Sequence, residues 1–146
     1  MVKRLGAAAL AVVALAACGG GGGGYGGPAP MPTVMPATSP LSTAMLSGGP
    51  GFIDSVNHTV YVFDGDRNTP NASACSDACA QYWPPITVAP GAALPPPWTS
   101  FVRSDGSTQL AYKTRALYAS AFDASPGQTS GDGVSAFGGN WHIARP

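Results

Sequence analysis

The chain has 146 residues, with seven Lys and Arg against seven Asp and Glu, so its formal net charge is zero. Only 10% of the residues are charged, whereas 20 are Gly and 15 are Pro. This length allows one domain with a tail, and the Gly and Pro content predicts a low-complexity segment. A nucleic-acid-binding protein of this size would carry a basic stripe. None is visible, and we therefore expect no nucleic-acid partner.

The N-terminus has the pattern of a bacterial secretion signal. Two basic residues precede an uncharged apolar stretch over residues 5–14, which is too short to span a membrane as a helix. The following Leu-Ala-Ala-Cys sequence resembles the bacterial lipobox. This resemblance implies that residues 1–17 are a lipoprotein signal peptide and that Cys18 is acylated. Gly19 after Cys18 favours the outer membrane, by analogy with lipoprotein sorting, with the protein facing the periplasm or the cell surface.

Residues 18–47 have the composition of a flexible tether. Six consecutive Gly residues at 19–24 predict a flexible coil, and the Pro-rich segment that follows predicts a more extended chain. We therefore expect a disordered tether anchored to the membrane through the Cys18 lipid, with an envelope protein as a second partner. Met31, Met35 and Met45 lie in this segment, and their thioether sulfurs suit Cu(I). We nevertheless favour a plain linker with incidental Met residues, and copper binding is the alternative.

Residues 48–146 carry short strand patterns separated by turn signals, and no long amphipathic helix pattern. The β-branched and aromatic run at 59–63 is the strongest strand pattern, and Asp105-Gly106 predicts a hairpin turn. The predicted strands are residues 51–56, 59–63, 99–103, 108–112, 115–120 and 140–144. One short helix is expected within residues 76–82, before a Trp-Pro-Pro break. The fold class predicted is a small all-β domain with antiparallel strands.

The domain contains two copies of one pattern. In each copy an Asp follows a Tyr by five residues, and a Trp follows the Asp by 17 or 18 residues. These residues are Tyr61, Asp66 and Trp83 in the first copy, and Tyr118, Asp123 and Trp141 in the second. The copies, about 48–98 and 99–146, are therefore offset by 57 or 58 residues. Such a repeat predicts that neither copy buries its apolar face alone.

The repeated pattern, over nearly all of residues 48–146, resembles a bacterial family of predicted lipoproteins with a Y-x-(F/W/Y)-x-x-D motif, the secreted repeat of unknown function. The first copy fits this motif closely. Tyr61, Phe63 and Asp66 match that motif, and Trp83 follows in a Cys-x-x-x-Cys-Ala-x-x-Trp-Pro-Pro sequence. The second copy departs from it, because Ser120 stands where an aromatic residue is expected, with Phe122 two residues further on. The resemblance implies an envelope location and a two-repeat architecture, but no activity.

Cys75 and Cys79 are the two cysteines that remain beside Cys18. A pair four residues apart in an oxidising compartment predicts a disulfide. A redox-active pair is an alternative, and so is a metal site completed by His58 and His142. The sequence has only two His residues, and no Ser-His-Asp catalytic triad can be recognised in it.

We therefore expect a non-enzymatic binding or structural module of the envelope, without catalytic residues, cofactor or metal. The alternative function is a metal-binding or redox accessory lipoprotein of the periplasm.

Overall fold

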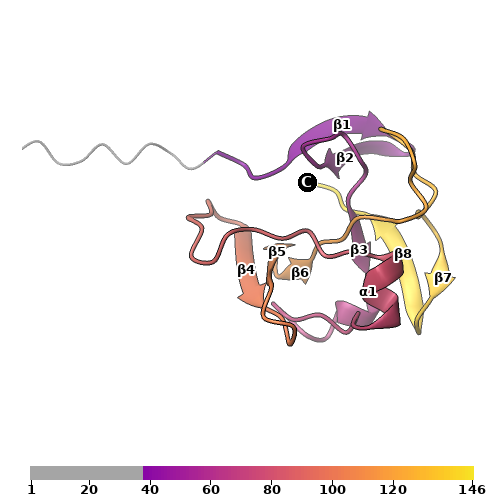
Figure 1. Ribbon diagram of the computed structural model, residues 1–146. Helices are drawn as coiled ribbons and strands as arrows, with labels where there is room; N and C mark the ends of the chain where they lie inside the picture. Colours follow the sequence, from indigo (N-terminus) through magenta and orange to yellow (C-terminus); the bar gives the residue numbers. More distant parts are fainter. Residues whose placement is uncertain (1–37) are drawn as a thin grey trace, which may run out of the picture. The chain divides into compact units, whose positions relative to one another are not determined.

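The computed structural model describes residues 38–146 (Figure 1). The predictions for the signal peptide, for Cys18, for the first part of the tether and for Met31 and Met35 concern residues outside this range. The described residues form one compact unit.

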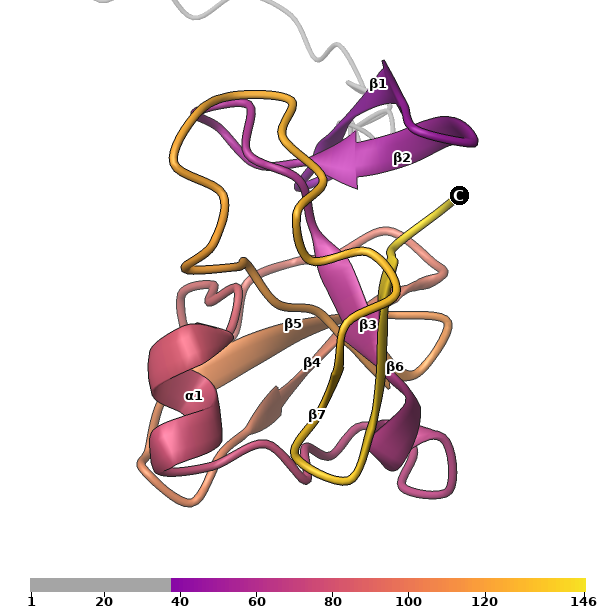
Figure 2. The same ribbon diagram turned by 90° about the vertical axis from the view of Figure 1, so that its right-hand side faces the viewer.

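Three small antiparallel sheets make up the domain (Figures 1 and 2). The first is the hairpin of β1 (Ser42–Leu46) and β2 (Gly49–Ile53). The second has the order β3–β8–β7, with β3 at Tyr61–Phe63, β7 at Ser135–Ala136 and β8 at Gly139–Ile143. The third has the order β4–β5–β6, with β4 at Trp98–Val102, β5 at Thr108–Tyr112 and β6 at Arg115–Ala116. The helical elements are α1 (Ala78–Tyr82) and one 3-10 turn, Asp64–Asp66. The all-β prediction with one short helix is confirmed.

Strand β1 corrects the predicted extent of the tether. Residues 42–46 were expected to be tether, but they pair along their whole length with β2, from Ser42 opposite Ile53 to Leu46 opposite Gly49. The turn between the strands uses two Gly residues at positive φ, and the Arg145 guanidinium donates to the carbonyls of Ser47 and Pro50 at 2.6 and 2.9 Å. The folded part therefore begins before residue 48. Strand β7 was not predicted either, because two residues carry too little pattern.

The two copies are related by matching backbone hydrogen bonds. In one ring of contacts, Phe52 N donates to Ala144 O, Ala144 N to Val60 O, and Val60 N to Phe52 O. The same ring recurs 57 or 58 residues away, among Leu110, Ile86 and Leu117. The predicted two-repeat architecture is thus visible in the backbone itself, and it places the β1–β2 hairpin and the β4–β5 hairpin at equivalent positions.

The copies are also interlocked. Tyr61 in β3 pairs with Ile143 in β8, and the equivalent bridge joins Tyr118 to Pro85. Between the copies, Tyr61 N donates to Tyr118 O at 2.7 Å and Tyr118 N donates to Tyr61 O at 3.0 Å. Each Tyr segment is therefore paired with the Trp-containing segment of the other copy, as expected if neither copy buries its apolar face alone.

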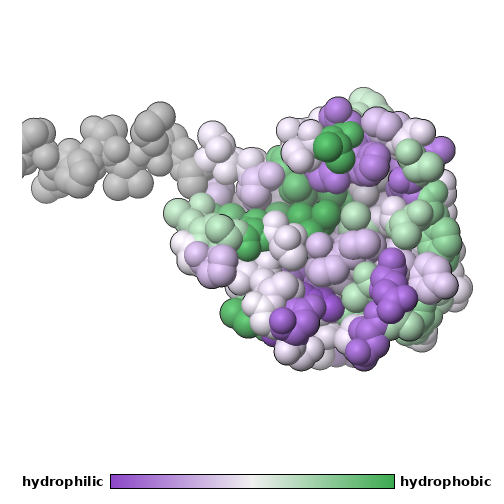
Figure 3. Space-filling model, in the orientation of Figure 1, coloured by the Kyte–Doolittle hydropathy of each residue, from purple (hydrophilic) through white to green (hydrophobic). Residues whose placement is uncertain are grey.

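Two apolar clusters fill the interior. One gathers around Trp83 and Trp141, both fully buried. The other gathers around Phe52, whose ring lies edge-on to Trp98 and Tyr112 at 4.9 and 4.8 Å. On the surface, the face drawn in Figure 3 carries a run of hydrophobic side chains (green) below the β1–β2 hairpin, bordered by strongly hydrophilic ones (purple).

Candidate functional site

The Tyr and Asp residues of the repeated motif pair crosswise. The Tyr61 hydroxyl donates to Asp123 Oδ2 at 2.6 Å, and the Tyr118 hydroxyl donates to Asp66 Oδ2 at 2.6 Å. Each hydrogen bond therefore joins the Tyr of one copy to the Asp of the other. All four residues are buried, and short bonds to a carboxylate are among the strong ones.

The second oxygen of each carboxylate holds a loop of its own copy. Asp66 Oδ1 accepts from Ala74 N at 2.7 Å, and Asp123 Oδ1 accepts from Ser130 N at 2.9 Å. The two aspartates therefore fix equivalent loops and, through the Tyr hydroxyls, tie the copies together.

The protonation equilibria of this cluster reflect its burial. Burial and the Asp123 carboxylate raise the pKa of Tyr61 far above its usual value. Burial and the Asp66 carboxylate do the same for the pKa of Tyr118. Burial also raises the pKa of Asp66, although bonds from Ala74 N and Tyr118 act in the opposite direction. The two Tyr hydroxyls thus remain protonated hydrogen-bond donors at any physiological pH.

The two Trp residues of the motif stack at the centre of the domain. The rings of Trp83 and Trp141 are 3.9 Å apart and almost parallel, at 2°. Tyr61 lies edge-on to Trp83, and Tyr118 lies edge-on to Trp141. Phe63 stacks on the outer face of this pair at 4.4 Å from Trp141. The motif residues therefore form one aromatic core.

The second copy replaces the aromatic residue of the motif in a different way. Ser120 stands at the position equivalent to Phe63 and is buried. Phe122 lies edge-on to Trp83, with ring centroids 5.8 Å apart, and is half exposed. Phe122 thus supplies an aromatic contact to Trp83, whereas Phe63 covers Trp141 more completely.

Cys75 and Cys79 form a disulfide, as predicted. Both residues are buried, at 0% and 5% exposure, and the disulfide joins α1 to the loop before it. This burial favours a structural staple, because a thiol-exchange reaction requires access to a sulfur atom.

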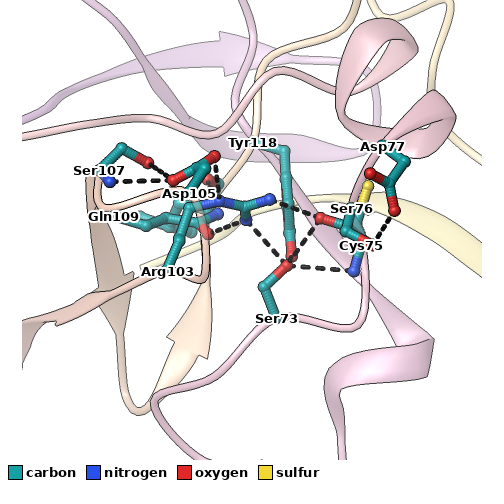
Figure 4. Close-up of polar contacts among 10 residues, drawn as sticks. Ser73, Cys75, Ser76, Asp77, Arg103, Asp105, Ser107, Gln109 and Tyr118 are labelled. Atoms are coloured by element: carbon teal, nitrogen blue, oxygen red, sulfur yellow. Dashed lines mark hydrogen bonds and ion pairs between the residues drawn. The ribbon is translucent and has the colours of Figure 1, made fainter.

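A buried arginine holds the disulfide loop (Figure 4). The Arg103 guanidinium donates to Cys75 O at 2.6 Å, to Ser73 Oγ at 2.9 Å and to the Gln109 side chain. Ser73 Oγ also lies 2.6 Å from the Tyr118 hydroxyl, so the network continues to Asp66. The exposed Asp105 carboxylate lies 3.4 Å from Arg103 Nε. Arg103 therefore links the disulfide loop, through Ser73, to the Tyr118–Asp66 pair.

Among residues 38–146, neither His is hydrogen-bonded to Cys75 or Cys79. His142 Nε2 lies 3.2 Å from Asp64 Oδ2, and its side chain is 44% exposed. The backbone N–H of His58 donates to Asp54 Oδ1, in the turn that follows β2. Within residues 38–146, no group of three or more His, Cys, Asp or Glu residues could hold a metal ion.

The structure thus brings Tyr61, Phe63, Asp66, Trp83, Tyr118, Asp123 and Trp141 into one buried cluster, which the sequence had only placed in register. It also adds partners that sequence reasoning missed, namely Ser73, Arg103 and Gln109. No spacing pattern signals them, because each is joined to the motif through space.

Comparison with known proteins supports the repeat. A profile of the family described as secreted repeat of unknown function matches residues 42–87 and 99–145, which together exceed half of the chain. The chain belongs to this family of secreted repeats. The first match begins at the start of β1, in agreement with the structure. No curated protein and no solved structure gave a match.

Proposed function

We propose that this secreted-repeat protein is a lipid-anchored, non-enzymatic binding or structural module of the bacterial envelope. The N-terminal sequence supports the anchor, because the apolar stretch ends at a Leu-Ala-Ala-Cys sequence. Several acyl chains on Cys18 would hold the domain firmly, since each buried CH2 contributes about 0.8 kcal/mol. Within residues 38–146, no helix is both long enough and apolar enough to cross a bilayer.

The crossed Tyr–Asp pairs are the observation that carries the non-enzymatic role. Catalytic acids and bases are poised in clefts where they can reach a substrate. Here the two hydroxyls whose pKa values are strongly raised, those of Tyr61 and Tyr118, are fully buried. Each is hydrogen-bonded to a carboxylate of the opposite copy. The family motif therefore serves as internal scaffold, and the surface is left for recognition of a partner in the envelope.

Metabolic labelling with an alkyne fatty acid tests the anchor. The wild-type chain, expressed in a bacterial host, is expected to carry the label and to sediment with membranes. Cys18→Ser should lose both properties. The double variant Cys75→Ser/Cys79→Ser is the matched control, because it replaces the two other cysteines, which form a disulfide, and should keep the label. Label retained on Cys18→Ser would refute the anchor.

Complementation of a deletion strain tests the non-enzymatic role. If the role of Tyr61 is structural, the Tyr61→Phe variant should restore the wild-type phenotype to the deletion strain in proportion to the amount of folded protein. Immunoblotting after limited proteolysis measures that amount. Loss of complementation at full folded abundance would instead assign chemistry to the Tyr61 hydroxyl.

A further inference from the structure

A pocket of about 420 Å³ lies where β3, β5, β6 and β8 meet. Its apolar wall includes Val62, Leu117 and Ile143. This volume falls in the range of small-ligand sites, which are commonly apolar with a few converging polar groups.

The charges around this pocket are one-sided. Only five Lys and Arg residues follow Cys18 in the sequence, and four of them line the pocket together with His142. These four are Arg67, Lys113, Arg115 and Arg145. The fifth, Arg103, is buried in the disulfide network. In a chain with 10% charged residues, this gathering creates a local positive field that favours an anion.

One carboxylate offsets part of this charge. Asp64 lies 2.9 Å from Arg67, 3.5 Å from Arg115 and 3.2 Å from His142. Leaving His142 aside, four cations and one carboxylate give a surplus of three positive charges, which suits a dianion better than a single carboxylate. The planar forks of the Arg67 and Arg115 guanidinium groups match phosphate oxygens.

The positions that the repeat relates to these cations carry no Lys or Arg. At the equivalent positions of the other copy, Ala124 replaces Arg67, His58 replaces Arg115 and Thr87 replaces Arg145. The loop equivalent to Lys113, residues 55–57, contains no Lys or Arg. The four cations, which come from both copies, are thus specific to this pocket and are not part of the pattern that the copies share.

Backbone strain at the rim of the pocket also points to a binding role. The turn between β5 and β6 consists of Lys113 at φ 48° and Thr114 at φ 65°. A β-branched residue in this left-handed region is a steric outlier, and such strain is concentrated at binding and active sites. The turn is held by bonds from Lys113 N to Pro97 O and from Asn71 N to Thr114 O. It fixes the start of the Lys113 side chain beside the pocket.

We propose that this pocket, which we call the cationic pocket, binds a phosphate monoester that carries an apolar substituent. The guanidinium and ammonium groups bind the phosphate, and the apolar wall contacts the substituent. The same chemistry is offered by a free phosphate ester and by the headgroup of phosphatidic acid. This inference deepens the binding half of the proposed function and does not depend on the lipid anchor.

Calorimetric titration of the purified full chain with phenyl phosphate tests the proposal. We expect saturable 1:1 binding that is weaker for inorganic phosphate, which has no apolar part. Arg67→Gln/Lys113→Gln changes two exposed residues and should weaken binding by about tenfold or more, since each nearby charge contributes on the order of 1 kcal/mol. Asp64→Asn should tighten binding by about fivefold, because it removes one opposing charge.

The matched control is Gln81→Glu/Gln128→Glu, which changes the net charge by the same amount at two exposed positions outside the pocket. It should leave the affinity within about twofold, because salt screens distant charges. Absence of saturable phenyl phosphate binding up to about 10 mM, equal weakening by the control, or weakening by Asp64→Asn would overturn the proposal.

Vesicles distinguish the two sources of the ligand. Recruitment of the Cys18→Ser chain to vesicles containing phosphatidic acid, lost in Arg67→Gln/Lys113→Gln, would support a lipid headgroup. Phenyl phosphate binding without vesicle recruitment would support a free ester. Vesicle recruitment without phenyl phosphate binding would refute the pocket and indicate surface electrostatics. Absence of phenyl phosphate binding, together with fatty-acid labelling of Cys18, would refute the ligand proposal and would still support the lipid anchor.

Discussion

The crossed pairing of Tyr61 with Asp123 predicts a specific pattern of energetic coupling. Tyr61→Phe removes a hydroxyl that donates to the buried Asp123 carboxylate at 2.6 Å and accepts from Gly131 N at 3.3 Å. A hydrogen bond to a charged group contributes about 1.5–3 kcal/mol, and the carboxylate left behind loses a partner away from water. We therefore expect Tyr61→Phe to lower the free energy of unfolding by about 2–3 kcal/mol.

A double-mutant cycle separates this bond from the other effects of each substitution. Tyr61→Phe combined with Asp123→Ala should show a coupling energy of about 1.5 kcal/mol or more, because both single variants remove the same bond. Tyr61→Phe combined with Asp66→Ala should be additive to within about 0.5 kcal/mol. No hydrogen bond joins Tyr61 to Asp66 among the described residues, although they belong to the same copy and the same motif.

Urea unfolding with the disulfide intact measures these energies. The buried, stacked Trp83 and Trp141 provide the fluorescence signal, since unfolding exposes both to water. The mirror cycle of Tyr118 with Asp66 and Asp123 provides an internal check. A coupling of Tyr61 with Asp66 as large as that with Asp123 would mean that the motif acts within one copy, and would refute the crossed arrangement.

Three further predictions concern packing, the disulfide and pH. Gly131→Ala would place a methyl group 2.8 Å from Trp83 ring atoms and 2.9 Å from Tyr61, and should destabilise the fold by about 1–3 kcal/mol in urea unfolding; an unchanged midpoint would contradict this packing. Cys75→Ser/Cys79→Ser should cost about 2 kcal/mol, the chain-entropy value for so short a loop, and thermal unfolding with and without reductant checks it. An effect of reductant on the double variant as well would point to another cause. The pKa of Asp64 lies below its usual value because, although partial burial opposes ionisation, His142 and Arg67 outweigh it. Asp64 therefore stabilises the fold above about pH 4, by less than about 1 kcal/mol because the site is partly exposed. This contribution is lost as the pH falls through the folded-state pKa. Melting curves of Asp64→Asn should thus differ from wild type at pH 7 and converge in strong acid; a gap that widened in acid would reverse the sign.

The repeat itself contains a signal for the first hairpin. The hairpin pattern at residues 99–112 is clear in the sequence because Asp105-Gly106 marks its turn. The equivalent residues of the first copy, 57 or 58 positions earlier, are β1 and β2. Their composition resembles a continuation of the Pro-rich tether. Local composition was misleading there, because β1 is defined by pairing with β2 and by the bonds from Arg145 near the other end of the chain.

The sequence by itself determined the two copies, the register of their Tyr, Asp and Trp residues, the all-β class and the Cys75–Cys79 disulfide. These follow from spacing and from local propensity, which act over a few residues. Only the tertiary structure decided that Tyr61 bonds to Asp123 rather than Asp66, and that Trp83 stacks on Trp141. It also brought four cations from separate segments around one pocket. These contacts join residues that are distant in the chain, and their geometry depends on how two interlocked copies bury their apolar faces against each other.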